Sequence, residues 1–389
     1  MGKNKKQEEL HNNNSLSSLY IHIPFCKQKC SYCDFASYAG KEDLMDQYIS
    51  KLTEELHFLL SANRFPLSTI YFGGGTPTLL PISNFEFLIS NIQKLIPKFP
   101  RLQDGQAMSN LEITIEANPG TIDKEYLKAL RDFGINRISI GVQSFNNKHL
   151  KTLGRIHDIK KIYQAFDAAR DAGFDNINLD LIFAIPEQTL KEWQNDLKNA
   201  LNLKPEHLST YNLQVEEGTP LYEKLTSKGN DLNRRLLNED LDAQMYEFAI
   251  DFIKENGYHH YEISNFAKKG LECRHNITYW ENRNYIGIGA GAHSHINGKR
   301  WGNPETIEEY LDSKPVVKIK HEEDITYAAK ETIFMGLRLI EGIPKEKFNG
   351  FENEVEKLKR EDFLEEKNKR IKLTKKGLFF GNLVFEEFI

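Results

Sequence analysis

Six short stretches rich in β-branched and aromatic residues constrain the fold of this 389-residue chain more than any other feature. They span residues 19–23, 69–72, 112–116, 137–141, 177–182 and 207–211. Segments with helical spacing of apolar residues lie between them, at 46–60, 124–133, 159–172 and 190–201. Such alternation predicts parallel strands joined by right-handed crossovers, so we expect an α/β fold.

Polar residues and glycines gather where these strands should end. The segments 73–76 and 116–119 follow two strands, Gln143 follows a third, and Asp180 lies within a fourth. The carboxyl ends of parallel strands meet at one edge of a sheet, where binding sites collect. This placement favours a sheet that curls around one mouth over an open sheet.

The pattern changes after about residue 215. Helical spacing dominates at 232–256, 326–339, 351–364 and 375–384, with a short strand candidate at 371–373. Residues 1–17 are polar and offer nothing to pack. We therefore expect a disordered leader over 1–17, a barrel over 18–230 and a smaller α-rich domain over 231–389.

Composition excludes several classes of protein. Lys and Arg number 51 against 56 Asp and Glu, and a net charge of -5 argues against nucleic-acid binding through phosphate contacts. No stretch approaches the roughly 20 consecutive apolar residues of a transmembrane helix. The leader also lacks the apolar core of a signal peptide. We expect a cytoplasmic protein with no nucleic-acid partner and no transmembrane segment.

Three of the four cysteines, Cys26, Cys30 and Cys33, fall within eight residues. The spacing C-x-x-x-C-x-x-C on a loop after a strand lets three thiolates face one centre. A structural zinc ion would need a fourth ligand, and none is evident nearby. A [4Fe-4S] cluster tolerates three thiolates when its fourth iron takes an external ligand. The alternatives to a cluster are three buried cysteines or a zinc loop.

The cysteine loop resembles the cluster-binding signature of the radical S-adenosylmethionine superfamily, and residues 73–77 resemble its GGGTP segment. The resemblance implies a partial (β/α)6 barrel in which S-adenosylmethionine chelates the fourth iron. It also implies that the glycine segment holds the methionyl amino end of the cofactor. Taken alone, a glycine-rich turn is either a tight turn or a row of N–H groups that could bind a carboxylate. Glu116 taken alone could be an exposed strand-end charge.

Residues 20–26, 141–145, 153–157 and 178–182 resemble the oxygen-independent coproporphyrinogen III oxidase group, and the similarity runs from about Leu19 to the C-terminus. The resemblance implies a set of cofactor-binding residues. One S-adenosylmethionine would contact Tyr20, Gly74 and Glu116, a second would contact Gly75, Thr76, Gln143, Arg155 and Asp180, and Tyr32 joins the cofactor-binding set. Taken singly, several of these could equally be surface or ion-pair residues.

Two departures separate the chain from the oxidases of that group. The oxidases carry another cysteine two residues past the third ligand, where this chain has Phe35, and they have a longer N-terminal arm. Residues 275–280 read H-N-x-x-Y-W, which is similar to the segment that marks the HemW-type haem chaperones. The resemblance implies that His275 takes part in haem binding. Without it, a lone histidine beside aromatic residues is more often a hydrogen-bonded packing residue.

We therefore expect a HemW-type haem chaperone with a [4Fe-4S] cluster, S-adenosylmethionine and haem. Its partners would be haem-acceptor proteins, among which the resemblance implies membrane enzymes of respiration. The alternative is an oxygen-independent coproporphyrinogen III oxidase, a radical decarboxylase, so the sequence leaves open whether the chain is an enzyme. A third reading is a zinc-stabilised scaffold for protein interactions.

Overall fold

A computed structural model describes residues 17–62, 67–96, 110–227, 238–314, 321–322 and 325–389. Residues 1–16 of the expected leader and the expected domain boundary at residue 230 lie outside these ranges.

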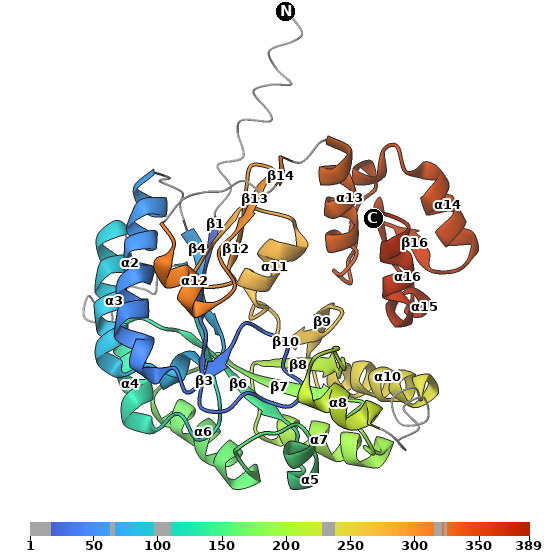
Figure 1. The fold of residues 1–389 in the computed structure, drawn as a ribbon. Coiled ribbons are helices and arrows are strands. Elements are labelled where there is room, and N and C mark those ends of the chain that lie inside the picture. Colours follow the sequence, from blue (N-terminus) through green and yellow to red (C-terminus); the bar gives the residue numbers. More distant parts are fainter. Residues whose placement is uncertain (1–16, 63–66, 97–109, 228–237, 315–320, 323–324) are drawn as a thin grey trace, which may run out of the picture.

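The six expected strands form one parallel sheet in chain order. They are β1 (Ser17–Ile23), β4 (Leu67–Gly74), β5 (Glu112–Ala117), β6 (Arg137–Gln143), β7 (Ile177–Phe183) and β8 (His207–Asn212). Each pairs in parallel with the next. The sheet curls into a partial barrel with helices on its outer face (Figure 1). The expected α/β class and the parallel order are confirmed.

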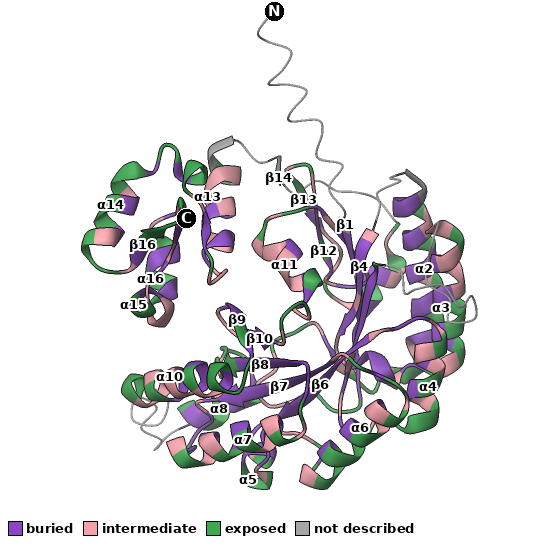
Figure 2. Ribbon diagram, turned by 180° about the vertical axis from the view of Figure 1, so that it is seen from behind, coloured by how far each residue is buried: buried purple, intermediate pink, exposed green. Residues whose placement is uncertain are grey.

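The outer helices cover the apolar face of this sheet. They are α2 (Met45–Ala62), α3 (Ile82–Leu95), α4 (Lys124–Asp132), α5 (Asn147–Thr152), α6 (Ile159–Asp171) and α7 (Leu190–Asn202), with the 3-10 turns η1 (Glu42–Leu44) and η2 (Pro77–Leu79). Strand alternation decides which residues they meet. The ring of Phe72 on β4 packs 5.6 Å from that of Phe85 on α3, whereas Thr69 and Tyr71 face the barrel interior. Figure 2 shows these helices buried toward the sheet and exposed on the opposite side.

Shorter strands extend the sheet at both edges. β11 (Tyr285–Ile288) pairs in parallel with the free side of β1, and β12 (His293–Ile296), β13 (Lys299–Gly302) and β14 (His321–Glu322) follow antiparallel. β10 (Asn265–Ala267) and β9 (His259–Glu262) add antiparallel strands beyond β8. Part of the expected C-terminal domain therefore completes the large sheet.

Among the residues that the structure describes, four further helices lie between β8 and the C-terminal segment. They are α8 (Pro220–Thr226), α10 (Glu239–Glu255), α11 (Arg274–Trp280) and α12 (Ile307–Asp312). Of these, α11 lies inside the barrel, because its His275 hydrogen bonds to Thr69 on the inner face of β4.

The last 65 described residues have their own apolar core, which includes Ile333, Val355, Leu364 and Phe388. The elements around it are α13 (Ile325–Gly336), β15 (Ile343–Pro344), η4 (Lys345–Phe348), α14 (Glu352–Arg360), β16 (Leu364–Lys367), β17 (Arg370–Leu373), α15 (Lys375–Phe379) and α16 (Gly381–Glu386). This part is helical, as expected, with one small antiparallel sheet. Among the described helices of the whole chain, none combines the length and apolar character needed to cross a membrane.

Candidate functional site

A cavity of about 530 Å3 opens at the carboxyl ends of the parallel strands. Most of the expected cofactor and cluster residues line it, namely Cys26, Cys30, Tyr32, Cys33, Gly74, Gly75, Thr76, Glu116, Gln143, Arg155 and Asp180. Tyr71 and Tyr211, which were not expected at the site, also line it, as does Asn118 from the segment 116–119 that was expected at this edge. Tyr20 and His275 are not among the lining residues.

The cysteine loop is held at its ends and in its middle. The two short strands β2 (Phe25–Cys26) and β3 (Tyr38–Ala39) pair across its base. Ser31 donates its N–H to the Leu153 carbonyl at 3.1 Å and accepts from the Leu221 N–H at 2.7 Å. Gly154 has a φ of +71°, and a Cβ there would lie 2.8 Å from the Ser31 nitrogen. Glycine is therefore required where the loop meets the β6–α6 connection.

The three sulfurs face the cavity with weak partners in the chain. Cys26 Sγ lies 3.6 Å from the Thr76 hydroxyl, and Cys33 Sγ lies 3.6 Å from a serine hydroxyl. Arg155 donates from Nη1 to Cys30 Sγ at 3.4 Å. Burial raises the pKa of the Cys26 thiol, and the Thr76 hydrogen bond opposes this rise.

This donor set suits an iron–sulfur cube, which takes each thiolate on a different iron. All three cysteines are free, and all three line one cavity. Among the described ranges, no three His, Cys, Asp or Glu side chains lie close enough to share one metal ion.

The glycine turn after β4 packs tightly against the start of the cysteine loop. Gly74 has a φ of +115°, and a Cβ there would lie 2.5 Å from the His22 ring. The N–H of Gly75 donates to the Ile23 carbonyl at 2.9 Å, and that of Thr76 to the Phe25 carbonyl at 2.8 Å. The idea that successive N–H groups here bind a ligand carboxylate is therefore wrong for this structure, because the chain itself uses them.

Glu116 sits at the end of β5 with its carboxylate held in place. The Tyr71 hydroxyl donates to Oε1 at 2.8 Å, and the Gly74 N–H donates to Oε2 at 3.1 Å. Burial raises the Glu116 pKa to about 7, and the charge of Asp180 adds to the rise while the Tyr71 hydrogen bond opposes it. Tyr20 lies just behind, with its ring 6.1 Å from that of Tyr71. A carboxyl of this kind is suited to meet a cationic group at neutral pH.

Three polar side chains from two neighbouring β-α units converge on Gly141. A Cβ on Gly141 would lie 2.9 Å from Arg155, from Asn118 and from Gln143. Arg155 donates to the Gly141 carbonyl at 2.8 Å and to the Asn118 side chain. Asn118 in turn donates to Thr76 Oγ1 at 2.7 Å. These contacts tie the β4, β5 and β6 ends to one another and to the cysteine loop.

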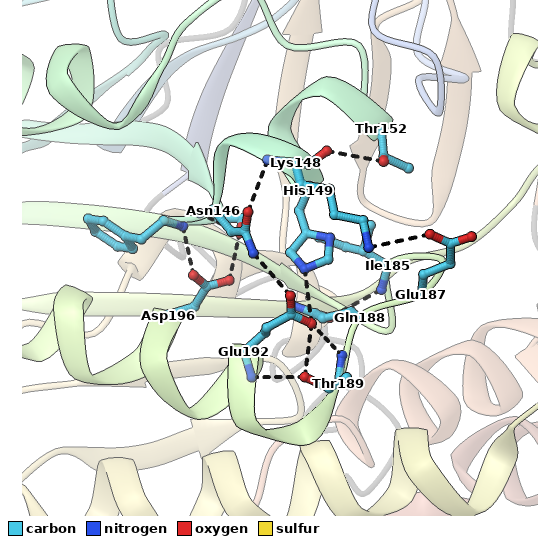
Figure 3. A network of polar contacts seen from close by, with 12 residues as sticks. Asn146, Lys148, His149, Thr152, Ile185, Glu187, Gln188, Thr189, Glu192 and Asp196 are labelled. Atoms are coloured by element: carbon cyan, nitrogen blue, oxygen red, sulfur yellow. Dashed lines mark hydrogen bonds and ion pairs between the residues drawn. The ribbon is translucent and has the colours of Figure 1, made fainter.

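Gln143 ends β6 in the left-handed region, with a φ of 65°. Such a conformation in a residue other than glycine costs about 1 kcal/mol or more. The loop that follows is fixed by Asp196 on α7, which accepts from Ser144 Oγ at 2.6 Å and from the Phe145 N–H at 2.8 Å. Figure 3 shows Asp196 within a polar network that joins α5 to α7. The network holds Gln143 in a strained position beside the cavity.

Asp180 reaches the cavity from the middle of β7. Its two carboxylate oxygens accept from Ser139 Oγ at 2.7 Å and from Asn178 Nδ2 at 2.8 Å. The donors come from its own strand and from β6, so the carboxylate is oriented by the sheet itself.

His275 lies behind the cavity in a closed network. Its Nδ1 is 2.7 Å from Thr69 Oγ1, and its Nε2 is 2.9 Å from the Tyr279 hydroxyl. Burial lowers the His275 pKa to about 3, and the charge of Arg137 adds to this. The Tyr71 ring, 4.9 Å from the imidazole, separates it from the cavity. Both ring nitrogens are occupied within the chain.

Family models match both parts of the molecule. A model of the radical SAM superfamily matches residues 20–200, and a model of the HemN C-terminal domain matches residues 326–380. The second match falls in the part of the chain with its own apolar core.

Curated relatives match along nearly the whole chain. The chain is 40% identical over 384 residues to "Heme chaperone HemW" of Lactococcus lactis subsp. lactis, covering 96% of this chain and 97% of the relative. It is 37% identical to the protein of that name in Bacillus subtilis, covering 96% and 99%. Among solved structures, coproporphyrinogen III oxidase from Escherichia coli, described as a radical SAM enzyme, matches with a TM-score of 0.80. That match covers 100% of this chain and 93% of the oxidase at 21% identity, so it shows a shared fold.

Proposed function

The chain belongs to the HemW family of the radical S-adenosylmethionine superfamily, and we propose that it is a haem chaperone, which binds haem and passes it to acceptor proteins. The observation that carries this proposal is the similarity to relatives named heme chaperone over 96% of the chain. Phe35 adds support, since it stands where the oxidases of the wider group carry a further cysteine.

We propose that Cys26, Cys30 and Cys33 hold a [4Fe-4S] cluster. When bound, the cluster supplies one-electron chemistry and an iron that can chelate S-adenosylmethionine. The cation of Arg155 near Cys30 Sγ lowers the cost of bringing thiolates together. Three free thiols require a reducing compartment, so we place the protein in the cytoplasm.

The residues around the cluster loop divide into two proposed cofactor contacts. Glu116 and Gly74 would meet the ammonium end of one S-adenosylmethionine, with Tyr20 behind them and Tyr32 beside the cysteines. The oriented carboxylate of Glu116 supports this role, because the ligand of an ammonium must be an acceptor. For a second S-adenosylmethionine we propose Gly75, Thr76, Gln143, Arg155 and Asp180.

We propose that His275 binds haem iron only after its network opens. An imidazole nitrogen that coordinates iron cannot also hydrogen bond, so one of the contacts to Thr69 and Tyr279 must be given up. The low pKa of His275 keeps the ring neutral, which is the form that binds metal. Acceptors would be haem-requiring membrane enzymes of respiration.

The test is a haem titration of anaerobically reconstituted protein, run beside an assay for decarboxylation of coproporphyrinogen III. We expect saturable haem binding and no carbon dioxide release. Carbon dioxide release coupled to consumption of S-adenosylmethionine, without stable haem binding, would show instead that the chain is the decarboxylase.

Two variants separate the roles of the His275 ring and its network. His275→Ala should weaken haem binding, because the ligand is lost. The Thr69 hydroxyl donates to Ser18 and so accepts from His275 Nδ1, which leaves Nε2, the partner of the Tyr279 hydroxyl, to bind iron. Tyr279→Phe should therefore strengthen haem binding by up to about fivefold, because a hydrogen bond worth about 1 kcal/mol no longer competes with iron. Unchanged haem spectra in both variants would remove His275 from the haem site.

A further inference from the structure

A second cavity, also of about 530 Å3, lies between the barrel and the C-terminal part. We call it the interdomain cleft. Its walls come from β7, β8, α10 and the turn before β10 on the barrel side, and from Arg338 and residues 378–383 and 385 on the other. α10 and α15 lie next to each other, with the rings of Tyr246 and Phe379 5.5 Å apart (Figure 1). The volume is within the range of cofactor pockets in general.

The walls of the interdomain cleft are mainly aromatic and aliphatic. Phe183 and Tyr246 line the barrel side, and Phe379, Phe380 and Leu383 line the other. Phe380 is 47% exposed and Leu383 is 52% exposed, so flat apolar surface is open at the cleft. Burial of such surface by a ligand is favourable.

Arg338 supplies one cation in this apolar setting. Its guanidinium carbon lies 4.4 Å from the Trp280 ring centroid and 6.0 Å from that of Phe385. Its Nε is buried without a hydrogen-bond partner. Burial raises the pKa of Glu262, and the charge of Arg338 opposes that rise, so one buried carboxylate already lies within reach of this charge. A guanidinium of this kind is a ready partner for a carboxylate.

We propose that the interdomain cleft holds haem, with a haem carboxylate on Arg338 and the macrocycle against the aromatic walls. The inference rests on the proposed chaperone function and assigns a place to its cargo. Haem suits the cleft because it is flat and largely apolar and carries its two carboxylates on one edge.

Charge in the cleft also sets the orientation of the ligand. Glu239 and Asp240, in the first turn of α10, form an acidic rim. They repel carboxylates, so the carboxylate edge turns toward Arg338 and away from α10.

The cleft connects to the cofactor cavity but not to His275. Asn212, at the end of β8, lines both cavities. His275 lines neither, and it keeps its contacts to Thr69 and Tyr279 while the cleft is formed. The cleft is therefore a haem position that is independent of iron ligation by His275.

The experiment compares haem with its dimethyl ester, in which both carboxylates are blocked. The full-length wild type should bind haem about tenfold more tightly than the ester, since a charge-assisted hydrogen bond distinguishes them. Arg338→Gln should lose this preference, with haem affinity about tenfold weaker and ester affinity unchanged. Arg360→Gln, on the surface of α14, is the matched control and should keep the preference.

A second variant guards against misfolding of Arg338→Gln. Leu383 is half exposed, so Leu383→Gln should fold as the wild type does, as checked by thermal melting. It should weaken haem and ester equally, by about threefold, because only apolar contact is lost. His275→Ala should keep the preference for haem over the ester.

The outcomes separate this inference from the function on which it rests. Wild type that binds neither ligand overturns both proposals. A second outcome is that wild type binds haem but folded Arg338→Gln keeps the preference for haem over the ester, or Leu383→Gln keeps both affinities. Either result overturns the interdomain cleft as the haem site and leaves the chaperone proposal standing.

Discussion

The mouth of the barrel and the His275 network lie on opposite sides of one tyrosine ring, yet they are built in opposite ways. At the mouth, the sulfurs have only distant partners, Gln143 is strained, and Glu116 has a raised pKa. Behind Tyr71, each nitrogen of His275 has a close partner, and the ring is neutral and enclosed. The side chains at the mouth can still bind a ligand, whereas the ring nitrogens of His275 are already hydrogen bonded within the fold.

Residue type alone therefore does not identify a ligand site. Cysteine and histidine both bind metals, but what matters is whether the donor atom is already used within the chain.

Cys30→Ser should abolish the cluster, because two thiolates cannot hold it, while leaving the stability of the metal-free chain unchanged within about 0.5 kcal/mol. Iron and sulfide analysis with urea unfolding measures both. The matched control is Cys273→Ser, since Cys273 is buried beside Glu112 and away from the cavity. The control variant Cys273→Ser should keep its full iron content. If Cys30→Ser also keeps its cluster, the sulfur atoms at the mouth are not the ligands that the comparison requires.

His275→Ala should show the reverse pattern. We expect a loss of about 3 kcal/mol of unfolding free energy, because a cavity forms and two buried hydroxyls lose their partner. Cluster content should stay the same. If urea unfolding shows a loss below about 1 kcal/mol, the network does not stabilise the fold as its geometry indicates.

Stability should respond to pH with opposite signs in the two regions. The His275 pKa is lowered from 6.5 to about 3, so the unfolded chain binds more protons in that window and stability falls as pH falls. The Glu116 pKa is raised from 4.5 to about 7, so its contribution falls as pH rises through that window. From about pH 5 to about pH 6.5, each effect amounts to about 2 kcal/mol.

The measurement is urea unfolding of wild type, His275→Gln and Glu116→Gln at both pH values. The unfolding free energy of wild type minus that of His275→Gln should increase from pH 5 to pH 6.5. The unfolding free energy of wild type minus that of Glu116→Gln should decrease over the same range. Parallel pH profiles for all three proteins would show that neither group is perturbed by its surroundings.

Gln143→Gly should stabilise the chain by about 0.5–1 kcal/mol, because glycine adopts a positive φ without strain. It should also weaken binding of S-adenosylmethionine, since a cavity-lining side chain is lost. Unfolding in urea and equilibrium dialysis test the two effects. A destabilised variant with unchanged binding would mean that the strain at the mouth serves no ligand.

The sequence predicts the parallel sheet because long apolar runs alternate with helical spacing. It also brings Cys30, Glu116 and Asp180 to one edge, since the ends of parallel strands must meet there. Tyr71 was missed, although it stands two residues before Gly73 and therefore shares its face of β4. The edge strands β11 to β14 were missed because they are two to four residues long and rich in glycine and polar residues.

Only one partner of the His275 ring, Tyr279 four residues further along α11, could be read from its neighbours in sequence. The other ring partner, Thr69, is 206 residues away, and the carboxylate that accepts from the His275 backbone N–H belongs to Glu112 on another strand. Neither pairing leaves a local pattern, because each depends on how α11 enters the barrel.

The pairing of β1 with β11 has a consequence for the newly made protein. The hydroxyl of Ser18 on β1 lies 2.8 Å from that of Thr278 in α11, the helix just before β11, and these two residues are 260 apart along the chain. At a synthesis rate of about 5–20 residues per second, one edge of β1 waits many seconds for its neighbour to leave the ribosome. During that interval a nascent chain can add a foreign strand at that edge.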